Sequence, residues 1–308
     1  MRRLDALTFK QLRALEAVAR TGSITLAAAD LGVTAPAVHS QLKTLEENFG
    51  CAMLTRPGAG SFRPAAEGQA LLGAFHKARV SLELAIHRID ALHRGFAGTV
   101  VLGVVSTGKY FAPSLVARLR EVYPDIEVVL RIGNRDSIIA ALQDSAIDLA
   151  IMGRPPRDPP VVAHEIGDHP HVLVAPPGHR LAGVGHVDPD DILSETIIVR
   201  EPGSGTRILA TRFLDRLGEG RPYETVEMGS NETIKQAVIA GLGIALISLH
   251  TVTEELKTGR LVTVAAAGLP IIRHWFVLHR ADLEMTGAIA RVRDFVEAKA
   301  GGILPKVG

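Results

Sequence analysis

The sequence predicts an α + α/β chain, with an N-terminal winged helix-turn-helix, a long helix and a larger C-terminal α/β domain. Three observations support this prediction. Residues 21–50 have the pattern of two helices joined by a tight turn. Apolar residues then repeat at alternating spacings of four and three over residues 71–92. From residue 99 on, short β-rich runs alternate with amphipathic helices. The predicted boundaries are 1–65, 66–95 and 96–308.

Composition narrows the class of protein. The chain has 308 residues, of which 47% are hydrophobic and 22% charged, so it can bury a core and is not disordered. Its one cysteine, Cys51, excludes an internal disulfide. The N-terminus lacks a secretion signal and no apolar run is long enough to span a bilayer, so we expect a cytoplasmic protein with no membrane partner. Residues 1–95 hold 12 Lys/Arg against 8 Asp/Glu, and the remainder is slightly acidic.

The helix-turn-helix pattern begins with Ser23 as a cap and turns at Gly32, after which Thr34 caps the second helix. Val38, Leu42, Leu45 and Phe49 give that helix a buried face, and its opposite face suits the DNA major groove. We expect the polar side chains of this face to reach base edges or phosphates, namely His39, Ser40, Gln41 and Lys43. The small residues, Ala35, Pro36 and Ala37, should make close apolar contacts with the DNA. The alternative is a helical hairpin with a solvated polar face.

Residues 4–72 resemble the DNA-binding domain of the LysR-type transcriptional regulators. The resemblance is carried by FKQLRALEAVA (9–19), GSITLAAADL (22–31), VTAPAVHSQLKTLE (33–46) and GQALL (68–72). It implies double-stranded DNA as a partner and places Arg56, on the predicted wing, beside the DNA backbone and minor groove. Arg63 lies on the same wing, where the alternative is a solvated surface charge.

The long helix predicted over about 66–94 carries an unbroken heptad seam: Leu71, Phe75, Ala78, Leu82, Ala85, Ile89 and Leu92. Such a seam is typical of a dimerising helix, and docking onto its own domain is the alternative. A two-fold dimer predicts an inverted-repeat operator. The family resemblance adds a tetramer built as a dimer of dimers, and RNA polymerase as a further partner.

The remaining part of the chain, about 210 residues, is long enough for two α/β lobes, about 96–167 with 270–300, and about 168–269. Short strands are predicted at 161–166 and at 171–175, among others. The stretches at 110–124, 146–153 and 237–248 resemble the effector domain of the LysR-type regulators. That domain is similar to the periplasmic binding proteins, with two crossing strands, which we expect near Gly167 and Pro270.

Ligands of open α/β lobes bind beyond the carboxyl ends of strands, near helix N-termini. We expect a cleft for a small anionic effector, a phosphorylated metabolite or a carboxylate, with Arg207 as a bidentate cation. The candidate residues are Ser106, Thr107, Lys109, Asn134, Gly203, Ser204, Thr206, Arg207 and Asn231. For Ser204, Thr206, Ser230 and Asn231, helix capping is the alternative.

Other functional classes have weaker support. No catalytic motif, cofactor motif or paired-cysteine metal motif is present, so we expect neither an enzyme nor a resident cofactor or metal. His164, His169 and His171 raise a metal-sensor alternative. A solute-binding or enzyme-like α/β protein with an incidental helical head is another. Within the LysR family, EPGSGTR (201–207) and the chain length are most similar to activators of carbon dioxide fixation operons, the CbbR type. A LysR-type regulator of another metabolic operon is the alternative.

Overall fold

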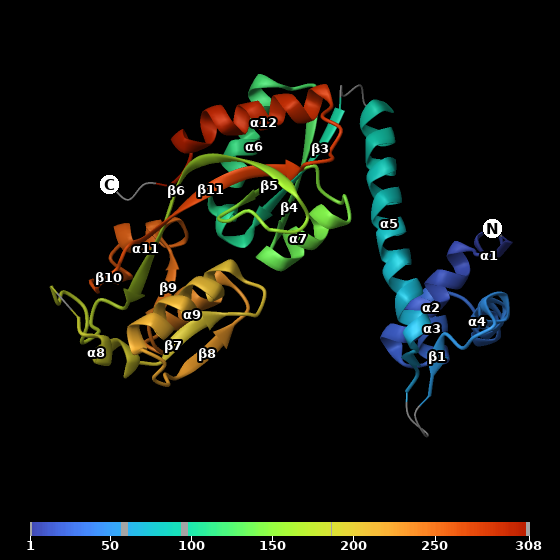
Figure 1. Ribbon diagram of the computed structural model, residues 1–308, viewed down its shortest axis with the longest axis horizontal. Helices are drawn as coiled ribbons and strands as arrows, with labels where there is room; N and C mark the ends of the chain where they lie inside the picture. The colour runs from blue at the N-terminus through green and yellow to red at the C-terminus, as the bar shows by residue number, and fades with distance from the viewer. Residues whose placement is uncertain (1, 57–60, 94–97, 186, 306–308) are drawn as a thin grey trace. The chain divides into compact units, whose positions relative to one another are not determined.

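The computed structural model describes residues 2–56, 61–93, 98–185 and 187–305, with the backbone alone at 2, 3, 84, 87, 88, 91 and 92. The chain divides into two compact units, Met1–Leu84 and Ala85–Gly308 (Figure 1). The division falls inside the long helix α5 (Ala66–His93), so the first part of this helix belongs to the N-terminal unit. Within the described residues, no helix combines the length and apolar character that crossing a bilayer requires.

The N-terminal unit is a helix-turn-helix with a wing. Its helices are α1 (Arg2–Asp5), α2 (Phe9–Thr21), α3 (Ile24–Leu31) and α4 (Ala35–Phe49), and its wing pairs β1 (Leu54–Thr55) with β2 (Arg63–Pro64). Thr8, Ser23 and Thr34 cap α2, α3 and α4 through their side chains. Leu15, Val18, Val38 and Leu45 lie in its buried core. The predicted caps Ser23 and Thr34 and the predicted turn at Gly32 are therefore confirmed.

Helix α5 packs onto this unit at its start. Gly68 allows the close approach, because a Cβ there would lie 2.0 Å from the carbonyl oxygen of Met53. Phe75 is buried edge-to-face on Phe9, with ring centroids 5.3 Å apart. The Arg79 guanidinium donates to both carboxylate oxygens of Glu16, at 3.1 and 3.0 Å. The first half of the helix is thus anchored to the head.

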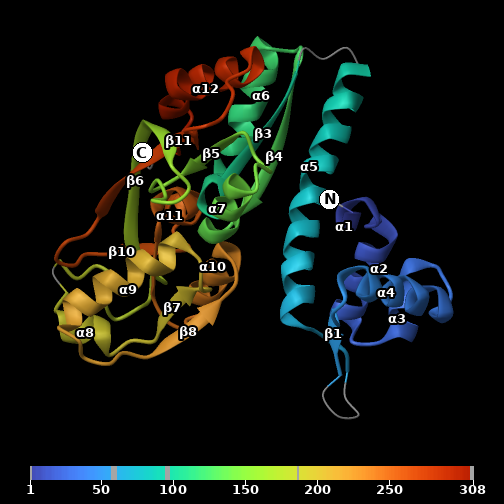
Figure 2. The same cartoon turned by 45° about the vertical axis from the view of Figure 1, so that its right-hand side comes forward.

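The C-terminal unit contains one seven-stranded sheet and a separate strand pair. The first lobe supplies the parallel strands β4 (Ile126–Gly133), β3 (Gly98–Val105) and β5 (Leu149–Met152). The long antiparallel strands β6 (Val161–Ala175) and β11 (Ile271–Arg280) cross from this lobe into the second, as Figure 2 shows. There β6 pairs with β9 (Ala245–Ser248) and β10 (Val262–Val264). The separate parallel pair is β7 (Ile197–Arg200) with β8 (Thr225–Met228).

Helices cover the strands of each lobe. The helices of the first lobe are α6 (Ala112–Val122), α7 (Arg135–Gln143) and α12 (Gly287–Lys299), and those of the second are α8 (Pro189–Leu193), α9 (Gly205–Gly218), α10 (Asn231–Ile239) and α11 (Thr253–Lys257). Short 3-10 helices occupy Ser106–Tyr110, Leu249–Thr251 and Ala300–Gly302. The sequence pattern did not predict α1, α8, α11, β10 or these three 3-10 helices.

The structure corrects one strand assignment. The two strands predicted at 161–166 and 171–175 form one continuous strand, β6. Gly167 lies inside it with a φ of 141°, which a glycine adopts readily. Opposite this point, the register of β11 shifts between Trp275 and Phe276. The break in the sequence pattern therefore marks an irregularity within a crossing strand, and not the end of a strand.

Candidate functional site

The predicted recognition face of α4 is open to solvent. Val38, Leu42 and Leu45 are buried, so the helix can present only its other side. Pro36, Ala37, His39, Ser40 and Lys43 are exposed on that side, and Ala35 and Gln41 are half-buried. Lys43 Nζ lies 3.8 Å from a carboxylate oxygen of Glu47. Because this ion pair is exposed and weak, a DNA phosphate could readily replace Glu47 as the partner of Lys43.

The two wing arginines are also exposed. The Arg56 guanidinium lies over the Phe62 ring, 5.1 Å from its centroid. Arg63 begins β2, and its carbonyl oxygen accepts a hydrogen bond from the Thr55 hydroxyl at 3.4 Å. The head thus presents an acid-poor helix face and a cationic wing, which suit a polyanionic duplex.

In the C-terminal unit, a cavity of about 460 Å³ lies between the two lobes. Its wall combines residues from β3, α7, the segment after β5, the crossing strands and the start of α9. Five of these residues are arginines, namely Arg135, Arg154, Arg157, Arg212 and Arg273, and none of the described lining residues is acidic. Burial lowers the pKa of Arg135, Asp136 partly offsets this, and the charge of Arg154 lowers the pKa further. The cavity therefore carries a positive potential that its own wall does not neutralise.

The N-terminus of α9 adds hydrogen-bond donors to this wall. Ser204, Gly205 and Thr206 line the cavity. The first N–H groups of a helix have no intrahelical acceptor, and the side chain of Ser204 at the N-cap position makes no capping bond to them. An anion in the cavity could accept these hydrogen bonds and would also be favoured by the helix dipole.

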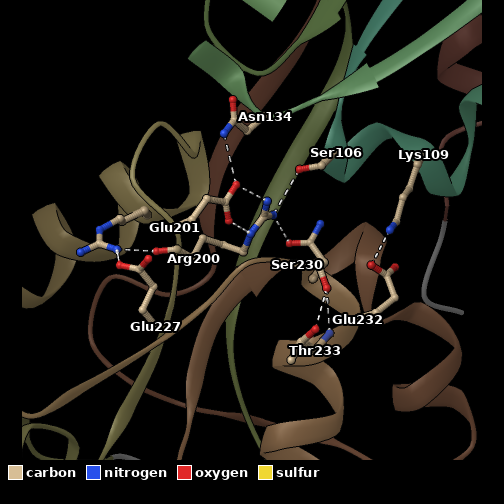
Figure 3. A network of polar contacts seen from close by, with 11 residues as sticks. Ser106, Lys109, Asn134, Arg200, Glu201, Glu227, Ser230, Glu232 and Thr233 are labelled. Atoms are coloured by element: carbon tan, nitrogen blue, oxygen red, sulfur yellow. Dashed lines mark hydrogen bonds and ion pairs between the residues drawn. The ribbon is translucent and has the colours of Figure 1, made fainter. Parts of the chain in front are cut away.

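A polar network beside the cavity joins the lobes at the end of β7 (Figure 3). Arg200 Nη1 donates to Ser106 Oγ at 3.2 Å and to Asn231 Oδ1 at 2.5 Å. Its Nε and Nη2 donate to the Glu201 carboxylate, and Asn134 Nδ2 donates to the same carboxylate at 3.4 Å. Lys109 forms an ion pair with Glu232 across the same boundary.

Comparison with known families decides the class of this molecule. Residues 93–301 match the LysR substrate binding domain, and residues 9–69 match the bacterial regulatory helix-turn-helix protein, lysR family. The chain is a LysR-family transcriptional regulator. Its head is therefore a DNA-binding domain and its two-lobe unit the substrate-binding domain of that family.

Individual relatives agree with this assignment. The chain is 52% identical over 306 residues to the HTH-type transcriptional regulator CbbR of Cereibacter sphaeroides, covering 99% of both chains. It is 35% identical over 305 residues to the RuBisCO operon transcriptional regulator of Allochromatium vinosum, covering 98% of this chain and 99% of that one. The CcmR regulatory domain of Synechocystis PCC6803, solved in complex with 2-PG, is 32% identical with a TM-score of 0.61. This match covers 65% of this chain and 96% of that chain.

Some of the predicted effector-binding residues meet at the interlobe cavity. Ser106, Thr107, Ser204 and Thr206 line the cavity, as does Arg154. Gly203 lies just outside, and its carbonyl oxygen accepts a hydrogen bond from the Asp136 N–H across the lobes. Asn134 caps α7 through Ser137 N as well as contacting Glu201. Ser230 caps α10, as the capping alternative expected.

Three predicted contacts lie elsewhere. Arg207 does not line the cavity, because its Nη1 donates to the carbonyl oxygen of Arg200 at 2.7 Å and pairs with Glu227. Lys109 and Asn231 are held by Glu232 and Arg200, respectively. Arg200, of the network beside the cavity, was absent from the prediction. So were Arg135, Arg157, Arg212 and Arg273, which line the cavity. These four belong to separate segments, and no spacing in the sequence indicates that they meet.

His164, His169 and His171, the residues of the metal-sensor alternative, do not form one metal site. His169 and His171 are adjacent, whereas His164 lies 3.7 Å from a carboxylate oxygen of Glu297. Within the described part of the chain, no group of three His, Cys, Asp or Glu side chains is arranged to hold a metal.

The predicted dimerisation seam divides into two parts. Phe75 is buried and Leu71 partly buried against the head, so this end follows the docking alternative. Ala78, Leu82, Ala85 and Ile89 are exposed in the single chain, and Leu92 falls outside the described side chains. Ile86, which was not in the predicted seam, is 57% exposed.

Proposed function

We propose that this regulator binds an inverted-repeat operator of a carbon dioxide fixation operon and senses a small anionic metabolite in the interlobe cavity. The observation that carries the effector assignment is the cavity wall, where five arginines meet the uncapped N-terminus of α9. A phosphate or carboxylate placed there would gain charge pairing and backbone hydrogen bonds together. The 2-PG complex of the CcmR regulatory domain supports an effector of this kind.

The operon assignment is supported by the relatives. One matches over 99% of its length and is named for the RuBisCO operon. We propose the same target genes here, with control of another metabolic operon as the alternative. We further propose a dimer formed through the exposed part of α5, assembled into a tetramer on DNA.

The effector would act through the lobes. Ser106 and Asn134 of the first lobe already contact Arg200 and Glu201 of the second. An anion that bridges the arginines of both lobes would favour one lobe arrangement over another. It can change DNA binding only if its affinity differs between these arrangements.

The test measures binding of the purified full chain to DNA upstream of the RuBisCO genes of its own genome, against a scrambled duplex, from 50 to 200 mM salt. We expect tight binding to the specific duplex that weakens steeply with salt. We also expect 2-PG or inorganic phosphate to alter the footprint. Equal, weak binding to both duplexes would contradict the operon assignment, and specific binding upstream of other metabolic genes instead would favour the alternative operon. Specific binding without any response to either anion would contradict the effector assignment alone.

A further inference from the structure

The crossing strands bury a cluster of uncharged imidazoles at the wall of the cavity. His169 and His171 come from β6 and both line the cavity, and His250 lies after β9. The His169 ring stacks on Trp275, with ring centroids 3.8 Å apart. Burial lowers the pKa of His171 and of His250 to about 4, and that of His169 well below its ordinary value. All three rings are therefore neutral near pH 7.

Hydrogen bonds determine which nitrogen of each ring carries the proton. His171 Nδ1 lies 3.1 Å from the His169 carbonyl oxygen, which can only accept, so the His171 proton is on Nδ1. The Trp275 indole N–H donates to His250 Nδ1 at 3.1 Å, so the His250 proton is on Nε2. These assignments follow from the partners, because a neutral imidazole has one donor and one acceptor.

The contact with Ser248 determines which nitrogen of His169 carries the proton. His169 Nε2 lies 3.0 Å from the Ser248 hydroxyl, and Ser248 is fully buried. Within the described chain, this nitrogen is the one hydrogen-bond partner of that hydroxyl, and a buried hydroxyl is stabilised by donating its proton. Ser248 therefore donates to Nε2, and the His169 proton is on Nδ1.

The Nδ1–H group of His169 is a buried donor with no hydrogen-bond partner. It lies against Gly153, another residue of the cavity wall, where a Cβ would come within 2.9 Å of Nδ1. A glycine therefore leaves this donor without a side chain over it. Orphaned buried donors are uncommon in native proteins, and this one belongs to a residue that lines a ligand-sized cavity.

We propose that His169 is a specificity-determining residue of the effector site, and that its Nδ1–H donates to an uncharged oxygen of the ligand. The arginines recognise negative charge, whereas a neutral imidazole recognises an acceptor through geometry. The effector is thus a small anion that also carries a hydroxyl or carbonyl oxygen. This inference rests on the proposed function, since it takes the interlobe cavity as the effector site.

The chain offers two matched substitutions. H169N places an amide near the position of Nδ1 and loses the contact with Ser248, whereas H169Q can reach Ser248 and leaves nothing at Nδ1. The probes are glycerol 3-phosphate and propyl phosphate, which carry the same anionic group and differ in their hydroxyls. Both are titrated calorimetrically into the full-length protein in phosphate-free buffer, after each variant has been checked for folding by the fluorescence of Trp275.

We expect the wild type and H169N to bind glycerol 3-phosphate about 3- to 10-fold more tightly than propyl phosphate, the range typical of one hydrogen bond. In H169Q the preference should fall below about 2-fold. A structural role through Ser248 predicts the opposite order of the two variants and would overturn the inference. G153A keeps the imidazole but covers Nδ1, so it should also remove the preference for glycerol 3-phosphate over propyl phosphate. This variant replaces H169Q in the test if H169Q fails to fold.

Two further outcomes separate this inference from the function on which it rests. Equal affinity of the wild type for both phosphates would overturn the role of His169 and leave the anion site intact. Binding of neither phosphate would overturn the anion site, and the role of His169 with it.

Discussion

Arg200 and Glu201, neighbours in the sequence, form a two-point ion pair where the two lobes meet, with Nε–Oε2 and Nη2–Oε1 distances of 2.7 and 2.8 Å. Burial alone would raise the Glu201 pKa. Hydrogen bonds from Arg200, from the Glu201 backbone and from Asn134, together with the charge of Arg200, outweigh burial and hold the pKa below its ordinary value. Arg200 is 3% exposed, so its charge depends on this carboxylate. The pair also contacts Ser106 and Asn134 of the opposite lobe (Figure 3).

E201Q should therefore destabilise the two-lobe unit. It leaves a buried guanidinium without its counter-charge, which we expect to lower the free energy of unfolding by about 2–4 kcal/mol. Urea unfolding of the full chain, followed by Trp275 fluorescence, measures this, because the only tryptophan of the sequence lies in that unit. E227Q is the matched control. It removes the half-exposed partner of Arg207 and should cost less than about 1 kcal/mol. Equal losses in the two variants would contradict the role of Arg200 as a buried charge.

The contribution of the sequence to this picture differs between the two units. The head is built from neighbouring residues, so Ser23, Gly32 and Thr34 predict the turn, and the spacing of Val38, Leu42 and Leu45 predicts the buried face. In the two-lobe unit, the order of the longer strands and helices was predictable, because each carries its own periodicity, whereas the short elements α8, α11 and β10 were not predicted. The continuity of β6 through Gly167 was not, because a glycine inside a strand resembles a turn in the sequence.

The cavity was predicted only in part, for a similar reason. Ser204 and Thr206 follow a strand and open a helix, which is a local signal. Arg273 and Arg212 meet in the cavity only because distant segments fold together, so no local pattern predicts them. Arg207 has the right sequence context for an anion ligand. Its direction is set by Glu227 and the Arg200 carbonyl oxygen, which lie 20 and 7 residues away in sequence.

This placement reverses the expectation for Arg207. R207A should change phosphate affinity by less than about 3-fold, because its side chain does not line the cavity. R154A removes a lining cation and should weaken phosphate binding about 10-fold or more. Calorimetric titration of both variants with inorganic phosphate measures the difference. A larger loss in R207A would show that Arg207 turns into the cavity when ligand binds.

Lys43 should contribute to DNA binding without reading the sequence. K43A is expected to weaken binding to specific and scrambled duplexes alike and to reduce the salt slope by about 1. Q41A should instead weaken mainly the specific complex. Fluorescence anisotropy over a salt series distinguishes the two, with K299A, an exposed lysine of the other unit, as the control. Unchanged affinity of K43A for scrambled DNA would argue against a phosphate contact.

The exposed apolar residues of α5 should form the dimer interface. Leu82, Ile86 and Ile89 are 47, 57 and 51% exposed in the single chain, and they recur at spacings of four and three. I86E would place a charge within a buried seam and should shift the protein to monomers in sedimentation equilibrium. Q69E changes an exposed polar residue of the same helix and should leave assembly unchanged. A fully dimeric I86E would place the interface elsewhere.

The buried histidines should make the two-lobe unit sensitive to mild acid. His171 and His250 stay neutral in the folded state down to about pH 4, because burial lowers their pKa, whereas in the unfolded chain they bind protons below about pH 6.5. Between these values the unfolded state holds more protons, so the free energy of unfolding falls as the pH falls. The loss is about 1.2 kcal/mol for each histidine on going from pH 7 to pH 5.5, above the range in which carboxylates titrate.

Urea unfolding at pH 7 and pH 5.5, followed by Trp275 fluorescence, tests this sign. H250N offers an amide oxygen to the Trp275 indole N–H in place of Nδ1 and removes one titrating group. Its loss of stability over this pH interval should be smaller than that of the wild type by about 1.2 kcal/mol. H76N, which changes an exposed histidine of the other unit, should lose as much stability as the wild type between pH 7 and pH 5.5. If stability rose or stayed constant between pH 7 and pH 5.5, the imidazoles would already be protonated in the folded state, and the donor assigned to His169 would have to be revised with them.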